Sequence, residues 1–348
     1  MRKIIIAALS TGVVLTSVTA CSPINKIAST VTHQSSKNVL TNRDGTNGKI
    51  LFVKVDDTPP AHPQIGINEA DVVYIEQVEG GLTRLAAIFT DPTRLPPLIG
   101  PVRSARISDI DIAAGFGRIA FAYSGVQTKM RPVIAAANVV NLSAEREPAS
   151  IYSRDLARVE PTNLILHAPE LLAKSGQEGA SLDDVKSIGF TFGDAPTNGR
   201  TLDKVKFSWP ASRYSAQWST TEKRWLLEYN GVPDLDANNV HLGPTTLILQ
   251  KVSITDSIYH DKVGGITPLS AVTGSGTAYM LRDGKVFPIF WNRATPTDKT
   301  SWTLKDGTSA HFASGQVWIA LIDKEPLFTY PVTVQEQKSS SPAPSKSK

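Results

Sequence analysis

The chain has 348 residues, of which 41% are hydrophobic, and its 36 Lys or Arg and 32 Asp or Glu residues give a formal net charge of +4. Residues 1–20 and the residues after Tyr330 each contribute a net charge of +2, so the remainder is neutral. A protein that binds nucleic acid needs a concentrated basic surface, so this balance argues against a nucleic-acid partner. A chain of this length can bury one or two sizeable cores.

Residues 1–20 predict a lipoprotein signal peptide. Arg2 and Lys3 precede an apolar stretch, and the segment ends in Val-Thr-Ala before Cys21. A short apolar run followed by small residues is typical of a secretory signal rather than a membrane helix. The ending resembles the bacterial lipobox, and Cys21 is the only cysteine, so we expect lipidation at Cys21 and no disulfide. The alternative is an ordinary signal peptide with a chance cysteine.

Two segments of biased composition flank the predicted folded region. Residues 21–48 are rich in Ser, Thr and Asn and predict a flexible tether with an r.m.s. span of about 30 Å. Residues 331–348 are rich in Ser, Pro and Lys and predict a disordered tail. Between them we expect an N-terminal α/β module over residues 49–190 and a C-terminal β-rich module over residues 191–330. Attachment through Cys21 would place these modules outside the cytoplasm, at the cell membrane.

The N-terminal module begins with an apolar strand that ends at Asp56, followed by two further strands separated by Gly80-Gly81. Two glycines between strands predict a two-residue hairpin turn, which needs positive φ angles. In that register Gln77 faces Arg84, and Glu76 lies on the opposite face of the sheet.

The segment GPVRSAR, residues 100–106, predicts the start of a helix, because proline suits the first helical position. Its arginines, Arg103 and Arg106, would then oppose the helix dipole at a cost of a few tenths to about 1 kcal/mol each. We therefore expect negatively charged groups, internal or from a ligand, to converge on this helix terminus.

The alternation of strands and helices up to residue 190 predicts a mixed sheet with helices packed on it. After Phe190 the sequence changes to short strands separated by turns, with hairpin signals at Asp283-Gly284 and Asp306-Gly307. All six tryptophans lie in this second half. They are expected to pack within sheets, although exposed ones could stack on sugar rings. The predicted fold class is α+β: a layered mixed sheet with helices in the first half and a β-rich second module.

Three stretches carry a resemblance to a known family: AHPQIGINEADVVYIEQVEGGLTRLAAIF, IGPVRSAR and GTAYMLRDGKVFPIFW. They resemble the two modules of the YerB-like bacterial lipoproteins, over most of residues 50–322. The resemblance implies an extracytoplasmic lipoprotein with a layered α+β fold, and it implies no reaction. The chain departs from the family pattern at His62, where arginine is more frequent, and at Ile75-Glu76, where an apolar residue separates the tyrosine from the acid.

The half-domain that carries the strongest resemblance concentrates arginines and carboxylates, which permits two interpretations. In the first, ion pairs lock the helix onto the hairpin, because the planar guanidinium suits bidentate carboxylate pairing. In the second, the arginines surround a cavity for an external phosphate, carboxylate or acidic envelope glycan, with helix N–H groups contributing. The candidate anion-binding residues are Arg84, Arg103, Ser104 and Arg106. The candidate acidic partners or acid–base residues are Asp56, Asp71, Glu76, Glu79 and His167.

Signatures of established enzyme classes are missing. The sequence contains no G-x-S-x-G motif, Walker loop or dinucleotide fingerprint, and its scattered histidines favour neither a metal site nor a cofactor. His167, near Glu170, is the best-placed general base, although a histidine after an apolar run is more often structural. We therefore expect a binding or scaffolding role toward an envelope polymer or envelope protein. The alternatives are an envelope enzyme that acts on a phosphate-containing or acidic glycan through the Arg/Glu cluster, and a structural module that recruits another protein.

Overall fold

A computed structural model describes residues 36–177 and 181–331. The predicted signal peptide, Cys21 and almost all of the predicted tail lie outside these residues. The predicted tether, 21–48, is described from residue 36, and there it differs from the prediction. Leu40 is fully buried in the core, and Arg43 pairs with Asp71 at 3.0 Å. The folded part therefore begins before residue 49, because one apolar side chain and one ion pair hold this segment on the sheet.

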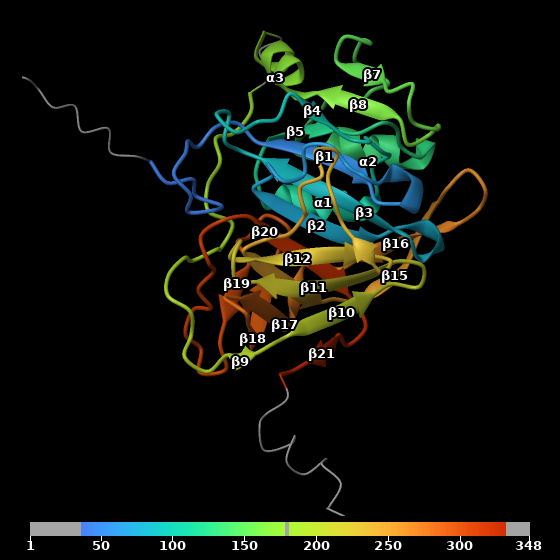
Figure 1. Cartoon of the computed structure of the whole chain (residues 1–348). Helices are drawn as coiled ribbons and strands as arrows, with labels where there is room; N and C mark the ends of the chain where they lie inside the picture. Colours follow the sequence, from blue (N-terminus) through green and yellow to red (C-terminus); the bar gives the residue numbers. More distant parts are fainter. Residues whose placement is uncertain (1–35, 178–180, 332–348) are drawn as a thin grey trace, which may run out of the picture. The chain divides into compact units, whose positions relative to one another are not determined.

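Within the described residues, eleven strands form one mixed sheet (Figure 1). The path runs β19-β18-β17-β14-β20-β2-β3-β1-β5-β6, and β9 pairs with β18. The bounds are β1 Leu51–Asp56, β2 Val72–Gln77, β3 Thr83–Phe89, β5 Ile119–Ala122, β6 Val139–Asn141, β9 Arg200–Thr201, β14 Thr246–Lys251, β17 Gly274–Arg282, β18 Lys285–Arg293, β19 Ser301–Thr303 and β20 Val317–Ile322.

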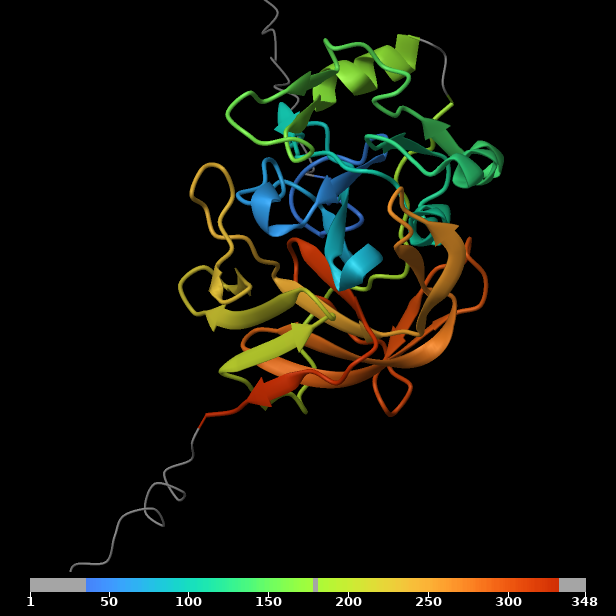
Figure 2. The same cartoon turned by 90° about the vertical axis from the view of Figure 1, so that its right-hand side faces the viewer.

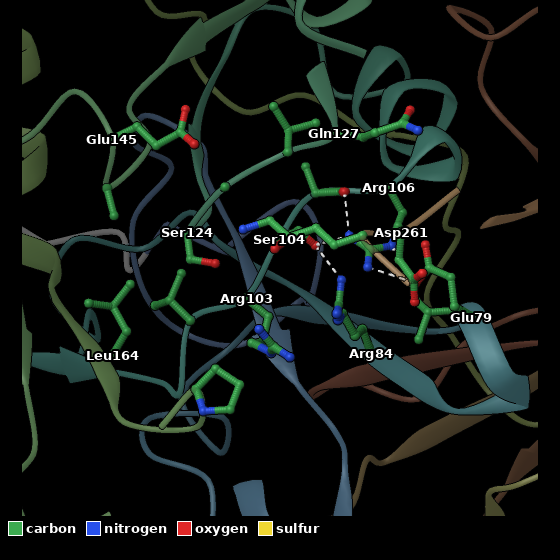
Figure 3. Close-up of a pocket in the computed structure, with 18 of the residues that line it drawn as sticks. Glu79, Arg84, Arg103, Ser104, Arg106, Ser124, Gln127, Glu145, Leu164 and Asp261 are labelled. Atoms are coloured by element: carbon green, nitrogen blue, oxygen red, sulfur yellow. Dashed lines mark hydrogen bonds and ion pairs between the residues drawn. The ribbon is translucent and has the colours of Figure 1, made fainter. Parts of the chain in front are cut away.

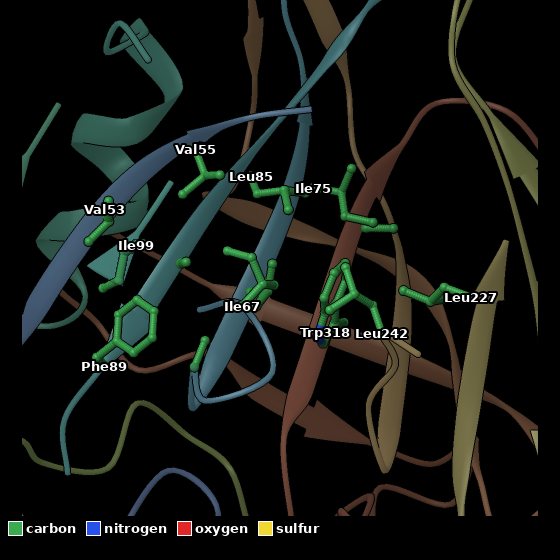
Figure 4. Packing of buried hydrophobic residues seen from close by; sticks show 14 of the residues in the cluster. Val53, Val55, Ile67, Ile75, Leu85, Phe89, Ile99, Leu227, Leu242 and Trp318 are labelled. Atoms are coloured by element: carbon green, nitrogen blue, oxygen red, sulfur yellow. The ribbon is translucent and has the colours of Figure 1, made fainter. Parts of the chain in front are cut away.

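The two halves of the chain meet inside this sheet. Strand β20, from the C-terminal half, lies between β14 and β2 and is parallel to both, with Val72 opposite Val317. Trp318 of β20 belongs to the same buried cluster as Ile75 of β2 and Leu227 of the second half (Figure 4). One core therefore spans the predicted module boundary, and all described residues fall into one compact unit.

Smaller sheets complete the β structure. The views in Figures 1 and 2 show a five-stranded sheet lying across the C-terminal strands of the main sheet. Its strands are β10 Lys204–Ser208, β11 Arg213–Ser219, β12 Arg224–Tyr229, β13 Val232–Pro233 and β21 Leu327–Thr329. A two-stranded sheet has β15 Ile254–His260 and β16 Ile266–Ser270, and a three-stranded sheet has β4 Leu98–Ile99, β7 Tyr152–Arg154 and β8 Leu164–His167.

Helices are few and short, and the described ones lie in the first half: α1 Ile107–Ala114, α2 Arg131–Ala136 and α3 Ala168–Gln177, with 3₁₀ turns η1 Pro59–Ala61, η2 Glu79–Gly81 and η3 Thr128–Met130. The fold is therefore α+β and strongly β-rich. No described helix has the length and apolar character needed to cross a membrane. Five tryptophans are buried and Trp218 is half-buried, so none of the six offers an exposed platform for a sugar ring.

The β2–β3 hairpin has a different register from the predicted one. Glu76 pairs with Arg84, and the connection is a 3₁₀ turn over Glu79–Gly81 that is closed by a hydrogen bond between Val78 and Leu82. The glycines both have positive φ, as predicted, but the loop contains three residues rather than two. A shift of one residue moves a side chain to the other face of a strand, so Glu76 lies on the same face as Arg84.

The predicted helix after Gly100 begins later than expected, at Ile107. The backbone before it is extended, because Val102 donates to the Leu164 carbonyl at 2.7 Å and Arg103 donates to the Lys54 carbonyl at 2.9 Å. These sheet-like hydrogen bonds override the local helical pattern. Arg106 is the N-cap residue, so Arg103 lies outside the helix and does not oppose its dipole from the first turn.

Candidate functional site

A pocket of about 850 Å³ lies where three parallel strands end. Strands β1, β5 and β6 are parallel, and the pocket is lined by Thr58 after β1, by Ser124 and Gln127 after β5, and by Glu145 after β6. In open sheets, ligands bind in the crevice outside the carboxyl ends of the strands. The tip of the β15–β16 hairpin, including Asp261, borders the pocket on another side (Figure 3).

The charged residues beneath the pocket share one face of the sheet. Asp56 pairs in register with Arg84, and Arg84 pairs on its other side with Glu76. Lys54 lies on the same face as Asp56 because side chains alternate along a strand. Lys54, Asp56 and Glu76 are fully buried, and Arg84 is 5% exposed. The sheet therefore places opposite charges side by side in a region without bulk water.

Lys54 joins the sheet to α1. Its ammonium group forms ion pairs with Glu76 and, at 2.8 Å, with Asp109. Asp109 also accepts the backbone N–H of Arg106 at 2.6 Å, at the N-terminus of the helix. Burial lowers the pKa of Lys54 to about 8, although Asp109 opposes this. The sequence analysis missed both residues. Two signals were available in the sequence. Lys54 is a lysine within an apolar strand, and Asp109 is an acid three residues after a helix cap.

Arg103 and Arg106 form direct ion pairs with carboxylates. Arg103 Nε donates to Asp56 at 2.7 Å. Arg106 contacts Glu79 through Nε at 2.8 Å and Nη2 at 2.7 Å. Glu79 also accepts the hydroxyl of Thr267 on β16. Burial would raise the pKa of Glu79, but Arg106 and these hydrogen bonds lower it below its ordinary value. Both arginines thus form the arginine–carboxylate ion pairs that the first interpretation of the sequence expects.

Arg84 differs from its two neighbours. Its Nη1 donates to the carbonyl of Ser104 at 2.8 Å, and its buried Nε has no hydrogen-bond partner among the described residues. No described carboxylate forms an ion pair with it. Burial, together with the positive charges of Arg106 and Arg103, lowers the pKa of Arg84 to about 9, although the charges of Asp56 and Glu79 oppose this. Arg84 borders the pocket, so a buried cation without a carboxylate contact faces this space (Figure 3).

Of the other candidates, only Ser104 lines the pocket. Asp71 is bound to Arg43 and to Thr90, whose N–H and hydroxyl both donate to it at 2.7 Å. His167, at the end of β8, lies 2.8 Å from the hydroxyl of Ser153 and does not line the pocket. Ser104 lines the pocket, whereas Asp56 and Glu76 lie behind it. Among the described residues, no group of three His, Cys, Asp or Glu could hold a metal ion.

Two family models match the chain. The model described as the N-terminal domain of a protein of unknown function (DUF3048) matches residues 39–181, and the model of the C-terminal domain matches residues 204–319. The first range contains the arginines of the pocket, and the second ends within strand β20, at Ile319.

Two comparisons with individual proteins agree with these models. A protein of Bacillus subtilis (strain 168), named "Putative lipoprotein YerB", is 23% identical over 283 residues, which cover 80% of this chain and 82% of the relative. The crystal structure of the YerB protein from Bacillus subtilis matches with a TM-score of 0.70 and 21% identity. This match covers 84% of the chain and 99% of the solved one, and it establishes a shared fold.

Proposed function

Because the chain belongs to the DUF3048 family of YerB-like proteins, whose description assigns no activity, we propose its function from the pocket itself: it is a lipid-anchored extracytoplasmic protein that binds an anionic ligand of the cell envelope. The family membership confirms the resemblance found in the sequence. The lipoprotein name of the relative and the lipobox-like end of the predicted signal peptide support the location. Cys21, the proposed anchor, lies outside the described residues.

The observation that carries the proposal is that Arg84 forms no ion pair with a carboxylate in the part of the chain that the structure describes. Taking a cation out of water is costly unless a partner compensates, and its neighbours Arg103 and Arg106 each have a carboxylate. The Ser104 carbonyl supplies one neutral acceptor to Arg84. An anion entering the pocket would give Arg84 a direct charged acceptor, and hydrogen bonds between ionised partners are the stronger ones.

The geometry favours binding over catalysis. Acid–base chemistry needs an acid and a base that converge on one reacting group. Glu79 is held in its charged form by Arg106, Glu76 lies behind the pocket beside Lys54, and His167 is outside the lining. The proton-transfer residues of the enzymatic alternative are therefore not assembled around Arg84.

Matched substitutions of two arginines test the proposal. Arg84→Gln removes the unpaired cation and is expected to weaken anion binding by about tenfold or more, because a charged hydrogen bond contributes roughly 1.5–3 kcal/mol. Its thermal stability should change little, since no carboxylate loses a direct partner. Arg106→Gln instead leaves Glu79 without its cation and should cost about 3 kcal/mol, as expected for breaking a buried pair.

Calorimetric titration of inorganic phosphate and of purified acidic envelope polymers, together with thermal unfolding, measures both effects. Equal anion binding by the wild type and Arg84→Gln would contradict the proposal, as would the absence of any anion binding by the wild type. Loss of stability in Arg84→Gln as large as that in Arg106→Gln would favour a purely structural role for this guanidinium.

A further inference from the structure

The pocket holds polar groups beyond the arginines, and they restrict the ligand. Resting on the proposed function, we propose that the ligand is a hydroxylated monoanion: a sugar or polyol that carries one phosphate or carboxylate group. Arg84 binds the oxyanion, and Ser104, Ser124 and Gln127 bind hydroxyl groups of the same molecule.

Three of these groups have no partner of their own. The hydroxyls of Ser104 and Ser124 line the pocket, and neither forms a side-chain hydrogen bond with another described residue. The Oε1 atom of Gln127 is buried and also lacks a partner. An unsatisfied buried polar atom carries a desolvation penalty, so Oε1 of Gln127, like Nε of Arg84, favours a polar ligand that satisfies it. The half-buried hydroxyls of Ser104 and Ser124 are free to bind the same ligand.

The segments that carry Ser104 and Ser124 lie side by side at the pocket. Ser104 binds Arg84 through its carbonyl at 2.8 Å, and its own hydroxyl lies beside Gly125. The two pocket segments are joined by backbone hydrogen bonds: Ala105 N–H donates to the Gly125 carbonyl at 3.0 Å, and Ser124 N–H donates to the Arg103 carbonyl at 2.9 Å. The backbone therefore holds Ser104 and Ser124 at the same pocket as Arg84 (Figure 3).

The part of the pocket beside Gly125 favours hydrogen-bond donors of the ligand rather than a second anion. Glu145 lies there, paired with Arg131 at 3.0 Å, and its Oε1 would be 3.5 Å from a Cβ atom at Gly125. A carboxylate and the Oε1 atom of Gln127 accept hydrogen bonds, and serine hydroxyls donate and accept them. Ligand hydroxyls match this set. A second phosphate beside Gly125 would be repelled by Glu145, and an acyl chain there would leave these groups unpaired. Lys262 and Arg154 also line the pocket, so this repulsion applies to the part near Glu145.

The size of the pocket agrees with this chemistry. A volume of about 850 Å³ is in the range that holds organic ligands of drug size. Inorganic phosphate would contact Arg84 alone. It would leave the side chains of Ser104, Ser124 and Gln127 without a partner.

The first test compares four probes by calorimetric titration into the full chain. Glucose 6-phosphate and glucuronate carry one anion and several hydroxyls, inorganic phosphate lacks the carbon skeleton, and dihexanoyl phosphatidic acid replaces hydroxyls with acyl chains. We expect at least one hydroxylated probe to bind about tenfold more tightly than inorganic phosphate, as two or three additional hydrogen bonds would provide. Tighter binding of phosphatidic acid than of both sugars overturns the proposed ligand class.

A glycine-to-alanine substitution separates binding from folding. A methyl group at Gly125 would lie 3.9 Å from Ser104 Oγ and 3.5 Å from Glu145 Oε1, which are ordinary contacts, and the backbone there is not left-handed. The Gly125→Ala variant should therefore fold normally, and its added methyl group should narrow the pocket beside the Ser104 hydroxyl. We expect it to weaken glucose 6-phosphate or glucuronate binding at least fivefold and to leave inorganic phosphate binding unchanged. Gly176→Ala on α3, where a Cβ atom meets nothing within 4 Å, is the matched control.

Removal of one hydroxyl gives an independent measurement. Ser124→Ala should weaken the sugar probes and spare inorganic phosphate, whereas Arg84→Gln should weaken both kinds of probe. If the sugars and inorganic phosphate bind equally and Gly125→Ala has no effect, the hydroxylated ligand is wrong and the anion site stands. If the wild type binds none of the probes, both proposals fail.

Discussion

Buried cations on the same sheet face have different partners in this protein. Lys54 contacts two carboxylates, Glu76 and Asp109, whereas Arg84 contacts a carbonyl. The cations at positions 54, 84, 103 and 106 and the carboxylates at positions 56, 76, 79 and 109 balance in number, so this charged cluster of sheet, turn and helix residues is neutral as a whole. The direct contacts are nevertheless uneven, and the unevenness leaves one guanidinium available at the pocket.

His62, where the family pattern more often has arginine, lies between two buried carboxylates. Its ring nitrogens are 3.0 Å from Asp234 and 3.3 Å from Asp57, and the ring stacks on Tyr229. Burial alone would lower the pKa of His62, but the two carboxylates raise it to about 10. Burial and Asp57 raise the pKa of Asp234, although His62 lowers it. We place the proton on His62, since its ring contacts both acids, so it supplies the positive charge that arginine would supply.

This assignment predicts a loss of stability at alkaline pH. The pKa of His62 is raised from 6.5 to about 10, so its contribution is complete below pH 6.5 and declines as the pH rises toward 10. Urea unfolding at pH 6.5 and pH 9 should show a lower free energy of unfolding at pH 9. His62→Gln, which does not titrate, is the control and should show a smaller difference. Equal pH dependence of the two proteins would mean that His62 is not protonated in the fold.

At the scale of the element, the turn over Glu79–Gly81 decides which residues of β2 face Arg84. Gly80 and Gly81 both have positive φ, of 68° and 72°. At Gly80 a Cβ atom would meet nothing within 4 Å, whereas at Gly81 it would lie 2.5 Å from Cβ of Pro210. The second glycine is therefore required both by the backbone conformation and by the approach of the loop before β11.

The two glycines should respond differently to substitution. Gly80→Ala imposes the left-handed conformation on an L-residue, which costs roughly 1–2 kcal/mol. Gly81→Ala adds a clash with Pro210, and overpacking costs a further 1–3 kcal/mol or so. We expect the midpoint of thermal unfolding to fall more for Gly81→Ala than for Gly80→Ala. A reversed order would show that the loop can move away from Pro210 without loss.

At the scale of the whole molecule, the central position of β20 makes the two halves interdependent. Strand β2 pairs with β3 on one side and with β20 on the other, and the residues of β20 are fully buried. Without the second half, β2 would become an exposed, apolar edge strand, which is a template for aggregation.

A fragment of residues 36–190 is therefore expected not to fold on its own. It should show no cooperative thermal transition by circular dichroism and should be largely insoluble, whereas co-expression with residues 191–331 should recover soluble complex. A chain of residues 36–331 is the control, because it keeps every described strand. Cooperative unfolding of the isolated first half would show that the pairing between β2 and β20 is dispensable.

The sequence by itself determined the family, the β-rich texture of the second half and the concentration of arginines and acids between residues 56 and 106, because these depend on residue type and local pattern. The tertiary structure decided which charge meets which. A hairpin longer by one residue moved Glu76 to the face of Arg84, and hydrogen bonds to Lys54 and Leu164 kept residues 102 and 103 extended. It also placed the loops after β5 and β6 beside the arginines, because parallel strands distant in sequence end at the same edge of the sheet.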